Sequence, residues 1–152
     1  MKALVAFYSR GGHTRRVGEE IARNLKAQKD EIIDLKDRSA KIISWIVAAK
    51  DAFLKKSTKI KQKKDPSKYP LVIIGTPVWA GSMAPAVRAY LNKNKFRKVA
   101  FFCTCGGNQG KVFGEMEKLS KKPLASLELR DRKIKDAGSK KRIRDFCAKL
   151  KK

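Results

Sequence analysis

The sequence predicts an α/β protein in which a parallel sheet carries helices on both faces. Apolar runs of strand length alternate with amphipathic helical segments along all 152 residues. Each connection between successive strands contains a helix, which is how parallel neighbours are joined in a sheet. Because no linker or low-complexity segment interrupts the alternation, we expect one domain spanning residues 1–152.

The first unit joins a short apolar run to an amphipathic helix through a polar turn. Residues 3–7 read Ala-Leu-Val-Ala-Phe, which is typical of a strand buried on both faces. Val17, Ile21 and Leu25 then recur at helical spacing among charged residues. The turn between these segments, residues 8–14, reads Tyr-Ser-Arg-Gly-Gly-His-Thr.

This turn has the composition of a phosphate-binding loop. The N–H groups of a first helical turn lack intrahelical partners, and the helix dipole adds partial positive charge there. Ser9 and Thr14 supply hydroxyl groups, and Gly11 and Gly12 let the backbone curve around an anion. The Lys-Ser/Thr pair of a triphosphatase loop and the spaced glycines of a dinucleotide fingerprint are both missing. A plain connection between a strand and a helix is the alternative interpretation.

Four further strand–helix units follow in the same order. The apolar patterns predict strands over residues 31–35, 71–75, 99–103 and 124–129. They predict helices over residues 40–57, from Pro85, over residues 112–119, and from Ser139. The helix around Trp45 is apolar over a wide arc, which indicates core packing or, alternatively, a ligand or partner surface.

Polar loops rich in Gly, Ser and Thr follow three of these strands. They comprise residues 9–14, 76–82 and 104–108. Ligands of open parallel sheets bind beyond the carboxyl ends of the strands, where the winding direction changes. The turns after the second and fifth strands read as ordinary charged turns. We therefore expect the three polar loops to form one binding site.

Charge and cysteine content narrow the functional classes. Three cysteines without a secretory signal argue against a disulfide scaffold and predict a cytoplasmic protein. No apolar run reaches the length of a membrane span. The net charge of +24 points to an acidic partner or, alternatively, to a lysine-coated surface that serves solubility.

With these loops in this order, the chain resembles the flavodoxin family over essentially its whole length. Its first loop resembles the FMN phosphate loop, and Gly-Thr-Pro-Val-Trp-Ala-Gly-Ser-Met-Ala-Pro resembles the flavin-ring loop. Cys-Thr-Cys-Gly-Gly-Asn stands where the third loop is expected. The likeness is greatest to short flavodoxin-domain proteins of archaea and anaerobic bacteria. It implies a three-layer sandwich whose five-stranded parallel sheet has the order 2-1-3-4-5.

The resemblance also implies a set of FMN contacts. These are Ser9, Arg10, Gly11, Gly12, His13 and Thr14 at the phosphate, Thr76, Pro77, Val78, Trp79, Ala80 and Gly81 on one side of the isoalloxazine ring, and Thr104, Cys105, Gly106, Gly107 and Asn108 on the other. Trp79 is the candidate to stack on the ring, with a core position as its alternative. Gly11 and His13 depart from the family pattern, which leaves two side-chain contacts to the phosphate open. Cys105 is expected near the flavin as a thiol.

These residues predict an FMN-binding electron carrier or small flavin oxidoreductase. An NAD(P)H-dependent quinone or flavin reductase is the first alternative, and a basic nucleic-acid-binding module on the same fold is the second. The protein is expected to be a monomer or homodimer that exchanges electrons with a redox protein or a small-molecule acceptor. Because the two flavin-ring loops contain no Asp or Glu, we expect a less negative flavin potential than in acidic flavodoxins.

Basic residues fall into two groups relative to the expected site. The lysine runs within residues 55–64, 93–98 and 121–122 belong to the edge opposite the flavin. A second group starts on the flavin side and comprises Arg10, Arg15, Arg16, Arg130, Arg132, Lys133, Lys135, Lys140, Lys141 and Arg142. We expect an acidic redox partner to dock on this second group. Nucleic acid fits less well because no stacking aromatic residues are interleaved with the lysines.

Overall fold

A computed structural model describes residues 2–36 and 58–152. The helix predicted over residues 40–57, with Trp45, lies outside the described residues. Within residues 2–36 and 58–152, no helix is long and apolar enough to cross a membrane.

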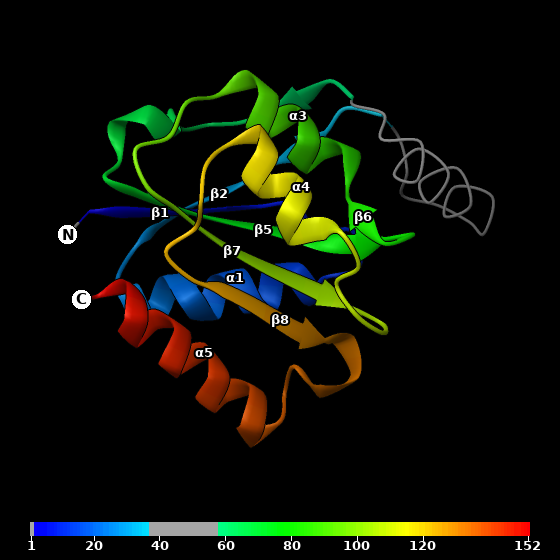
Figure 1. The fold of residues 1–152 in the computed structure, drawn as a ribbon, viewed down its shortest axis with the longest axis vertical. Coiled ribbons are helices and arrows are strands. Elements are labelled where there is room, and N and C mark those ends of the chain that lie inside the picture. Colours follow the sequence, from blue (N-terminus) through cyan, green and yellow to red (C-terminus); the bar gives the residue numbers. More distant parts are fainter. Residues whose placement is uncertain (1, 37–57) are drawn as a thin grey trace.

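A parallel sheet forms the centre of the molecule (Figure 1). Its strands are β1 (Ala3–Phe7), β2 (Gln28–Glu31), β5 (Leu71–Trp79), β7 (Val99–Cys105) and β8 (Ser126–Arg130). They lie in the order β2-β1-β5-β7-β8, and all four neighbouring pairs are parallel. Numbered along the chain, this is the order 2-1-3-4-5, so the predicted fold class and strand order are confirmed.

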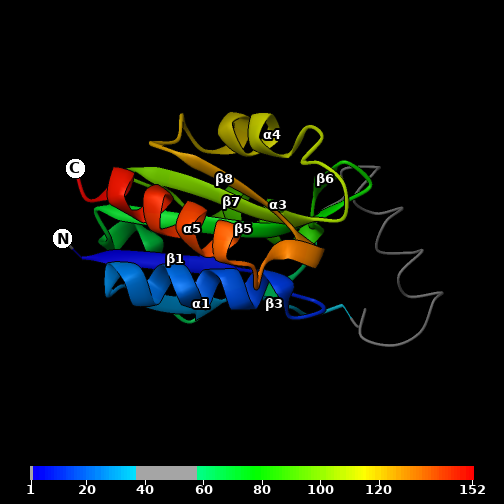
Figure 2. The ribbon, with the colours of Figure 1, turned by 90° about the horizontal axis from the view of Figure 1, so that it is seen from below.

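Helices cover both faces of this sheet. In Figure 1, α3 (Pro85–Lys93) and α4 (Val112–Leu119) lie on one face, while α1 (His13–Leu25) and α5 (Ala137–Leu150) lie on the other. Figure 2 looks onto α1 and α5 from below. Short elements complete the described chain: β3 (Ile33–Asp34) pairs with β4 (Ile60–Lys61), β6 (Ser82–Met83) pairs with β5, and two 3₁₀ turns span Pro66–Lys68 (η1) and Asp131–Lys133 (η2).

Alternation along the central strands divides the core into two halves. On β1, Leu4 and Ala6 face the cluster beneath α3 and α4, whereas Val5 and Phe7 face the cluster beneath α1 and α5. Every residue of β1 and β7 is buried, as expected for parallel strands covered on both faces. The strands that lead into the first and third polar loops are therefore held by packing on both faces.

Four of the five predicted strands have other boundaries in the structure. The second strand of the sheet is Gln28–Glu31 instead of residues 31–35, and residues 33–34 pair with β4. The sequence Gln-Lys-Asp-Glu of this edge strand is entirely polar, so it lacks the apolar pattern from which strands were predicted. Asp30 is nevertheless buried, and its carboxylate accepts the backbone N–H groups of Lys63 and Lys64 at 3.0 and 2.8 Å. The third strand continues through residues 76–79 and the fourth through residues 104–105, both predicted as loop. The fifth strand is Ser126–Arg130 instead of residues 124–129.

Candidate functional site

A cavity of about 550 Å³ opens at the carboxyl ends of β1, β5 and β7. Its lining residues are Arg10, Gly11, His13, Thr14, Pro77, Val78, Trp79, Ala80, Thr104, Gly106 and Asp131. All three loops singled out in the sequence contribute to it. A cavity of this size falls within the ~300–1,000 Å³ typical of small-molecule sites.

The first loop ends at an open helix N-terminus. Gly12 begins α1 with a φ of 99°, a left-handed conformation that suits glycine. No described side chain caps this end, and no acidic residue lies in the first turn. Ser9 Oγ accepts the Gly12 N–H at 3.1 Å, which fixes the loop. The first-turn N–H groups beyond Gly12 therefore face the cavity side as donors for an anion.

A hydroxyl pair joins the first loop to the third. Thr14 Oγ1 and Thr104 Oγ1 lie 2.8 Å apart, and both residues are almost completely buried. This contact ties the start of α1 to the end of β7. It fixes the spacing between the loops on which a ligand would rest.

The second loop is a tight hairpin between β5 and β6. Trp79 pairs with Ser82, so Ala80 and Gly81 form a two-residue turn with φ angles of 51° and 74°. Such a turn needs two left-handed residues, and alanine adopts this conformation at a cost of about 1–2 kcal/mol. Because Ala80 lines the cavity, the strained residue lies at the site itself.

Trp79 is a core residue that also lines the cavity, and its stacking on a flavin ring stays a prediction. Its ring packs edge-to-face on Tyr8, with the ring centroids 5.6 Å apart and an interplanar angle of 85°. Only 9% of Trp79 is exposed, and this remaining surface lines the cavity. The residue is thus a core contact whose outer part is available to a flat ligand.

A buried ion pair beneath the hairpin was not predicted. Arg88 on α3 and Glu115 on α4 lie 3.4 Å apart, with side chains 10% exposed. Ser82 Oγ donates to Glu115 at 2.6 Å and accepts from Arg88 at 3.0 Å. Thr76 Oγ1 accepts the Ala84 N–H at 3.0 Å on the other side of the hairpin. These contacts connect β6 to both covering helices, and sequence spacing gives no sign of them.

The third loop places its cysteine against β8. Cys105 Sγ lies 3.6 Å from the carbonyl oxygen of Leu129, and burial, followed by the nearby charges of Glu128 and Asp131, raises the pKa of the thiol to about 11. Glu128 accepts the Gln109 N–H, and Gly81 O accepts the Lys111 N–H at 2.9 Å. The second and third loops therefore support one another, while Cys105 does not line the cavity.

Asp131 is a lining residue that the sequence analysis missed. It begins η2 directly after β8, in a turn interpreted as an ordinary charged turn. Its carboxylate lies 3.5 Å from Nδ1 of His13, a residue of the first loop that also lines the cavity. Its position after the strand next to β7 was the signal that could have found it.

Seven predicted contacts lie outside the cavity lining. These residues are Ser9, Gly12, Thr76, Gly81, Cys105, Gly107 and Asn108. Several of them shape the loops: Ser9 bonds the Gly12 N–H, Thr76 bonds the Ala84 N–H, and Asn108 Oδ1 accepts the Gly110 N–H at 2.9 Å. Their assignment as cofactor contacts stays a prediction.

Similar proteins identify the fold. No protein-family model matches the chain. Over 120 residues it is 30% identical to an NAD(P)H dehydrogenase (quinone) from Chromohalobacter salexigens, covering 76% of this chain and 53% of that protein. The chain thus spans about half the length of this curated relative.

Two solved structures cover nearly the whole chain. A flavoprotein from Lactobacillus acidophilus, solved in complex with FMN, is 24% identical with a TM-score of 0.68, over 91% of this chain and 98% of that one. The oxidised flavodoxin 2 of Bacillus cereus is 15% identical with a TM-score of 0.65, over 99% and 98%. The chain therefore has the flavodoxin-like fold, and the resemblance noted in its sequence is confirmed.

Proposed function

We propose that this protein binds FMN and works in electron transfer, as a carrier or a small flavin oxidoreductase. The observation that carries this proposal is the cavity of about 550 Å³ between three loops, one of which ends at the open N-terminus of α1. A structurally similar protein, the flavoprotein of Lactobacillus acidophilus, was solved with FMN.

The shape and chemistry of the cavity fit this cofactor. A Cβ added at Gly11, Gly106 or Gly107 would meet no described atom within 4 Å, so the glycines leave open space where a ligand approaches the backbone. The first-turn N–H groups of α1 and the guanidinium of Arg10 suit a phosphate group. Trp79 and Pro77 on one side, with Thr104 and Gly106 on the other, suit a flat ring.

Within this proposal the cofactor supplies the reversible uptake of electrons, and the chain supplies binding and electrostatics. Residues 10–14 hold the phosphate, and the hairpin at residues 79–82 covers one side of the ring. The His13–Asp131 pair places one carboxylate at the cavity mouth and offsets part of its positive charge. No cavity-lining side chain is assigned a catalytic role.

An NAD(P)H-dependent quinone reductase is the second candidate. It is favoured by the 30% identity to a protein named NAD(P)H dehydrogenase (quinone), of which this chain covers 53%. Oxidation of NADH or NADPH by the FMN-loaded protein, with benzoquinone as acceptor, tests this candidate. Turnover supports the reductase, and FMN binding without turnover supports the carrier.

We also propose a single domain, a cytoplasmic location and an acidic redox protein as partner. The net charge of +24 supports the last of these, because an acidic protein would be steered toward such a surface. Arg15, which the sequence placed in the second basic group, donates two hydrogen bonds to Glu31 at 2.9 and 2.7 Å, so this cation is already paired within the chain.

Absorption spectroscopy tests FMN binding directly. The purified protein, alone and after addition of FMN and desalting, is expected to retain flavin absorption bands. FMN should quench tryptophan fluorescence, and a Trp79→Phe variant separates this signal from that of Trp45.

Gly12→Val should weaken FMN binding at least tenfold by straining the loop, whereas Gly114→Ala, on the exposed side of α4, should leave FMN binding unchanged. Absence of retained flavin in the wild type would contradict the proposal.

A further inference from the structure

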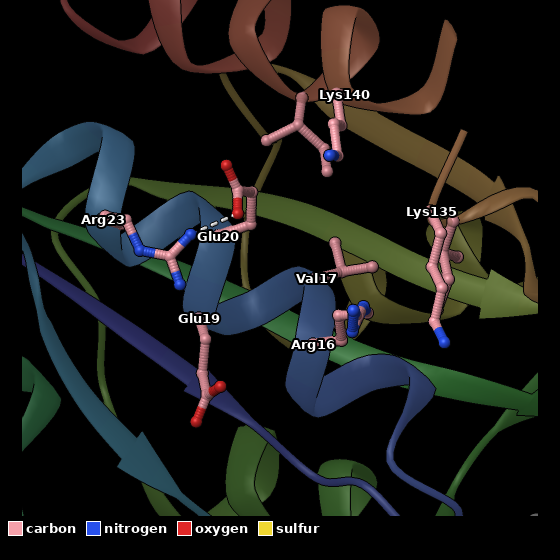
Figure 3. Close-up of a pocket in the computed structure, with 9 residues that line it drawn as sticks. Arg16, Val17, Glu19, Glu20, Arg23, Lys135 and Lys140 are labelled. Carbon is pink, nitrogen blue, oxygen red and sulfur yellow. Dashed lines mark hydrogen bonds and ion pairs between the residues drawn. The ribbon is translucent and has the colours of Figure 1, made fainter. Parts of the chain in front are cut away.

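A second cavity lies between α1 and the start of α5, outside the site described above. Its volume is about 250 Å³, and Figure 3 shows the residues around it. Val17, Ile134 and Ile143 give it an apolar floor, and each of these residues is at most 6% exposed. Charged side chains of α1, of α5 and of the segment before α5 form its rim. We call this cavity the α1–α5 cleft.

The positive charge of the rim is only partly compensated. The Glu20 carboxylate accepts hydrogen bonds from Arg23 and from Asn24, so the charges of Glu20 and Arg23 offset one another. Glu19 points away from α5 in Figure 3 and lies 3.6 Å from Lys29. Arg16, Lys135 and Lys140 are exposed, and among the described residues their side chains make no hydrogen bond or ion pair.

The cleft borders the mouth of the first cavity. His13 and Asp131 line that cavity. Arg16, three residues after His13, and Ile134, three residues after Asp131, line the cleft. Residues three apart on a helix are neighbours on its surface. A protein seated on the cleft would therefore lie beside the proposed flavin site, which is where an electron donor or acceptor has to dock.

We propose that the α1–α5 cleft is the docking site of an acidic redox protein, which places carboxylates against Arg16, Lys135 and Lys140 and one aliphatic side chain on the apolar floor. This rests on the proposed function for the redox nature of the partner, but the binding itself does not require FMN. The three cations supply charge complementarity and steering. The floor supplies the apolar contact that purely electrostatic attraction lacks.

A nucleic acid is the less suitable occupant of this cleft. Phosphates would use the same cations, but none of the lining residues that the structure describes is aromatic and could stack a base. Val17, Ile134 and Ile143 offer instead a surface that suits an aliphatic side chain. The test therefore includes an oligonucleotide as a competing ligand.

The test uses fluorescent peptides and two matched variants. One peptide consists of glutamates around a central leucine, and a second has serine in place of the leucine. The cleft variant combines Arg16→Gln, Lys135→Gln and Lys140→Gln. The control variant combines Lys95→Gln, Lys98→Gln and Lys122→Gln, which are exposed and lie near the start of β7 or β8, at the opposite edge. Both variants remove three positive charges, so they change the overall field equally.

Fluorescence anisotropy should show that the cleft variant binds the leucine peptide about tenfold more weakly, since it loses three exposed charge contacts. The control variant should lose less than about threefold, and the serine peptide should bind the wild type more weakly than the leucine peptide. Equal losses in both variants would overturn the proposal in favour of a diffuse field. Equally tight binding of a single-stranded oligonucleotide of the same charge, lost in the cleft variant, would overturn it in favour of phosphate recognition.

Failure of this proposal is distinguishable from failure of the proposed function. Flavin absorption is recorded in the same samples, with and without peptide. Bound peptide with retained flavin bands supports both proposals, and displacement of FMN by the peptide would contradict a separate cleft. Retained flavin without peptide binding removes the docking site alone, whereas peptide binding without any flavin removes only the redox function.

Discussion

Cys105 and Cys147 show how burial sets the chemistry of single residues. Burial is the largest cause that raises the pKa of each thiol to about 11, and the pKa of Cys103 is also raised by burial. The reactive form of cysteine is the thiolate, so all three side chains should be inert in the folded protein at neutral pH.

Alkylation measures this protection. At pH 8, iodoacetamide should modify the native protein at least tenfold more slowly than the urea-unfolded chain, because unfolded thiols ionise near their ordinary pKa of about 8.5.

The raised pKa values favour the neutral thiol in the folded state. Their contribution to stability is therefore complete below about pH 8.5 and is lost as pH rises toward 11. Fast modification of the native protein at pH 8, followed by mass spectrometry, would contradict this account.

Helix α1 is positioned by a glycine at its contact with the sheet. A Cβ added at Gly18 would lie 2.6 Å from Cδ1 of Phe7, a side chain that is 2% exposed. Gly114 on α4 is exposed, and a Cβ there would meet no described atom within 4 Å. Both glycines lie within helices, but of the two only Gly18 would place a Cβ against another side chain.

We expect Gly18→Ala and Gly114→Ala to change stability in opposite directions. Gly18→Ala should lower the free energy of unfolding by about 1–3 kcal/mol through overpacking against Phe7. Gly114→Ala should raise it by up to about 1 kcal/mol through helix propensity. Urea denaturation measures both values. An equal gain in the two variants would mean that α1 does not press on β1 at this point.

The pair Arg88–Glu115 anchors the β5–β6 hairpin to helices α3 and α4. Glu115→Ala should lower the free energy of unfolding by about 3 kcal/mol, because it leaves the Arg88 charge buried and uncompensated. It should also weaken FMN binding, since Ser82 loses its acceptor next to the Trp79 hairpin.

A double-mutant cycle separates the pair from simple truncation. Arg88→Met in the Glu115→Ala background should recover part of the lost stability, because no unpaired charge then remains. Additive losses in the double variant, measured by denaturant unfolding, would show that the two side chains do not depend on one another.

The charge of the whole molecule should raise the potential of a bound flavin. With a net charge of +24, the protein favours uptake of negative charge, and one close cation in a wet site contributes about 1 kcal/mol, or about 20 mV for a two-electron couple. Asp131 at the cavity mouth opposes this effect locally, which the sequence analysis did not include.

A redox titration of the FMN-loaded protein tests this prediction. The potential should be less negative than in acidic flavodoxins and should fall as salt screens the surface charges. Asp131→Asn should raise it further, with Asp145→Asn on the outer side of α5 as a control. A potential that is as negative as in acidic flavodoxins and insensitive to salt would contradict the electrostatic argument.

Local sequence patterns determined the fold class, the strand order inferred through the resemblance, and the three loops around the cavity. Buried parallel strands are nearly continuous apolar runs, and loops that approach a ligand need Gly and small polar residues, so both features are visible locally. Ten of the predicted contacts, among them Arg10, Trp79 and Thr104, do line the cavity.

Only the tertiary structure decided which distant side chains meet. Asp30 on the edge strand β2 accepts the backbone N–H groups of Lys63 and Lys64, and the Asp131 carboxylate lies 3.5 Å from His13. Glu115 meets Arg88 from another helix. These contacts join polar residues, and polar residues of the same types are also common on the surface. Their burial and pairing depend on the packing of whole elements, which no local pattern encodes.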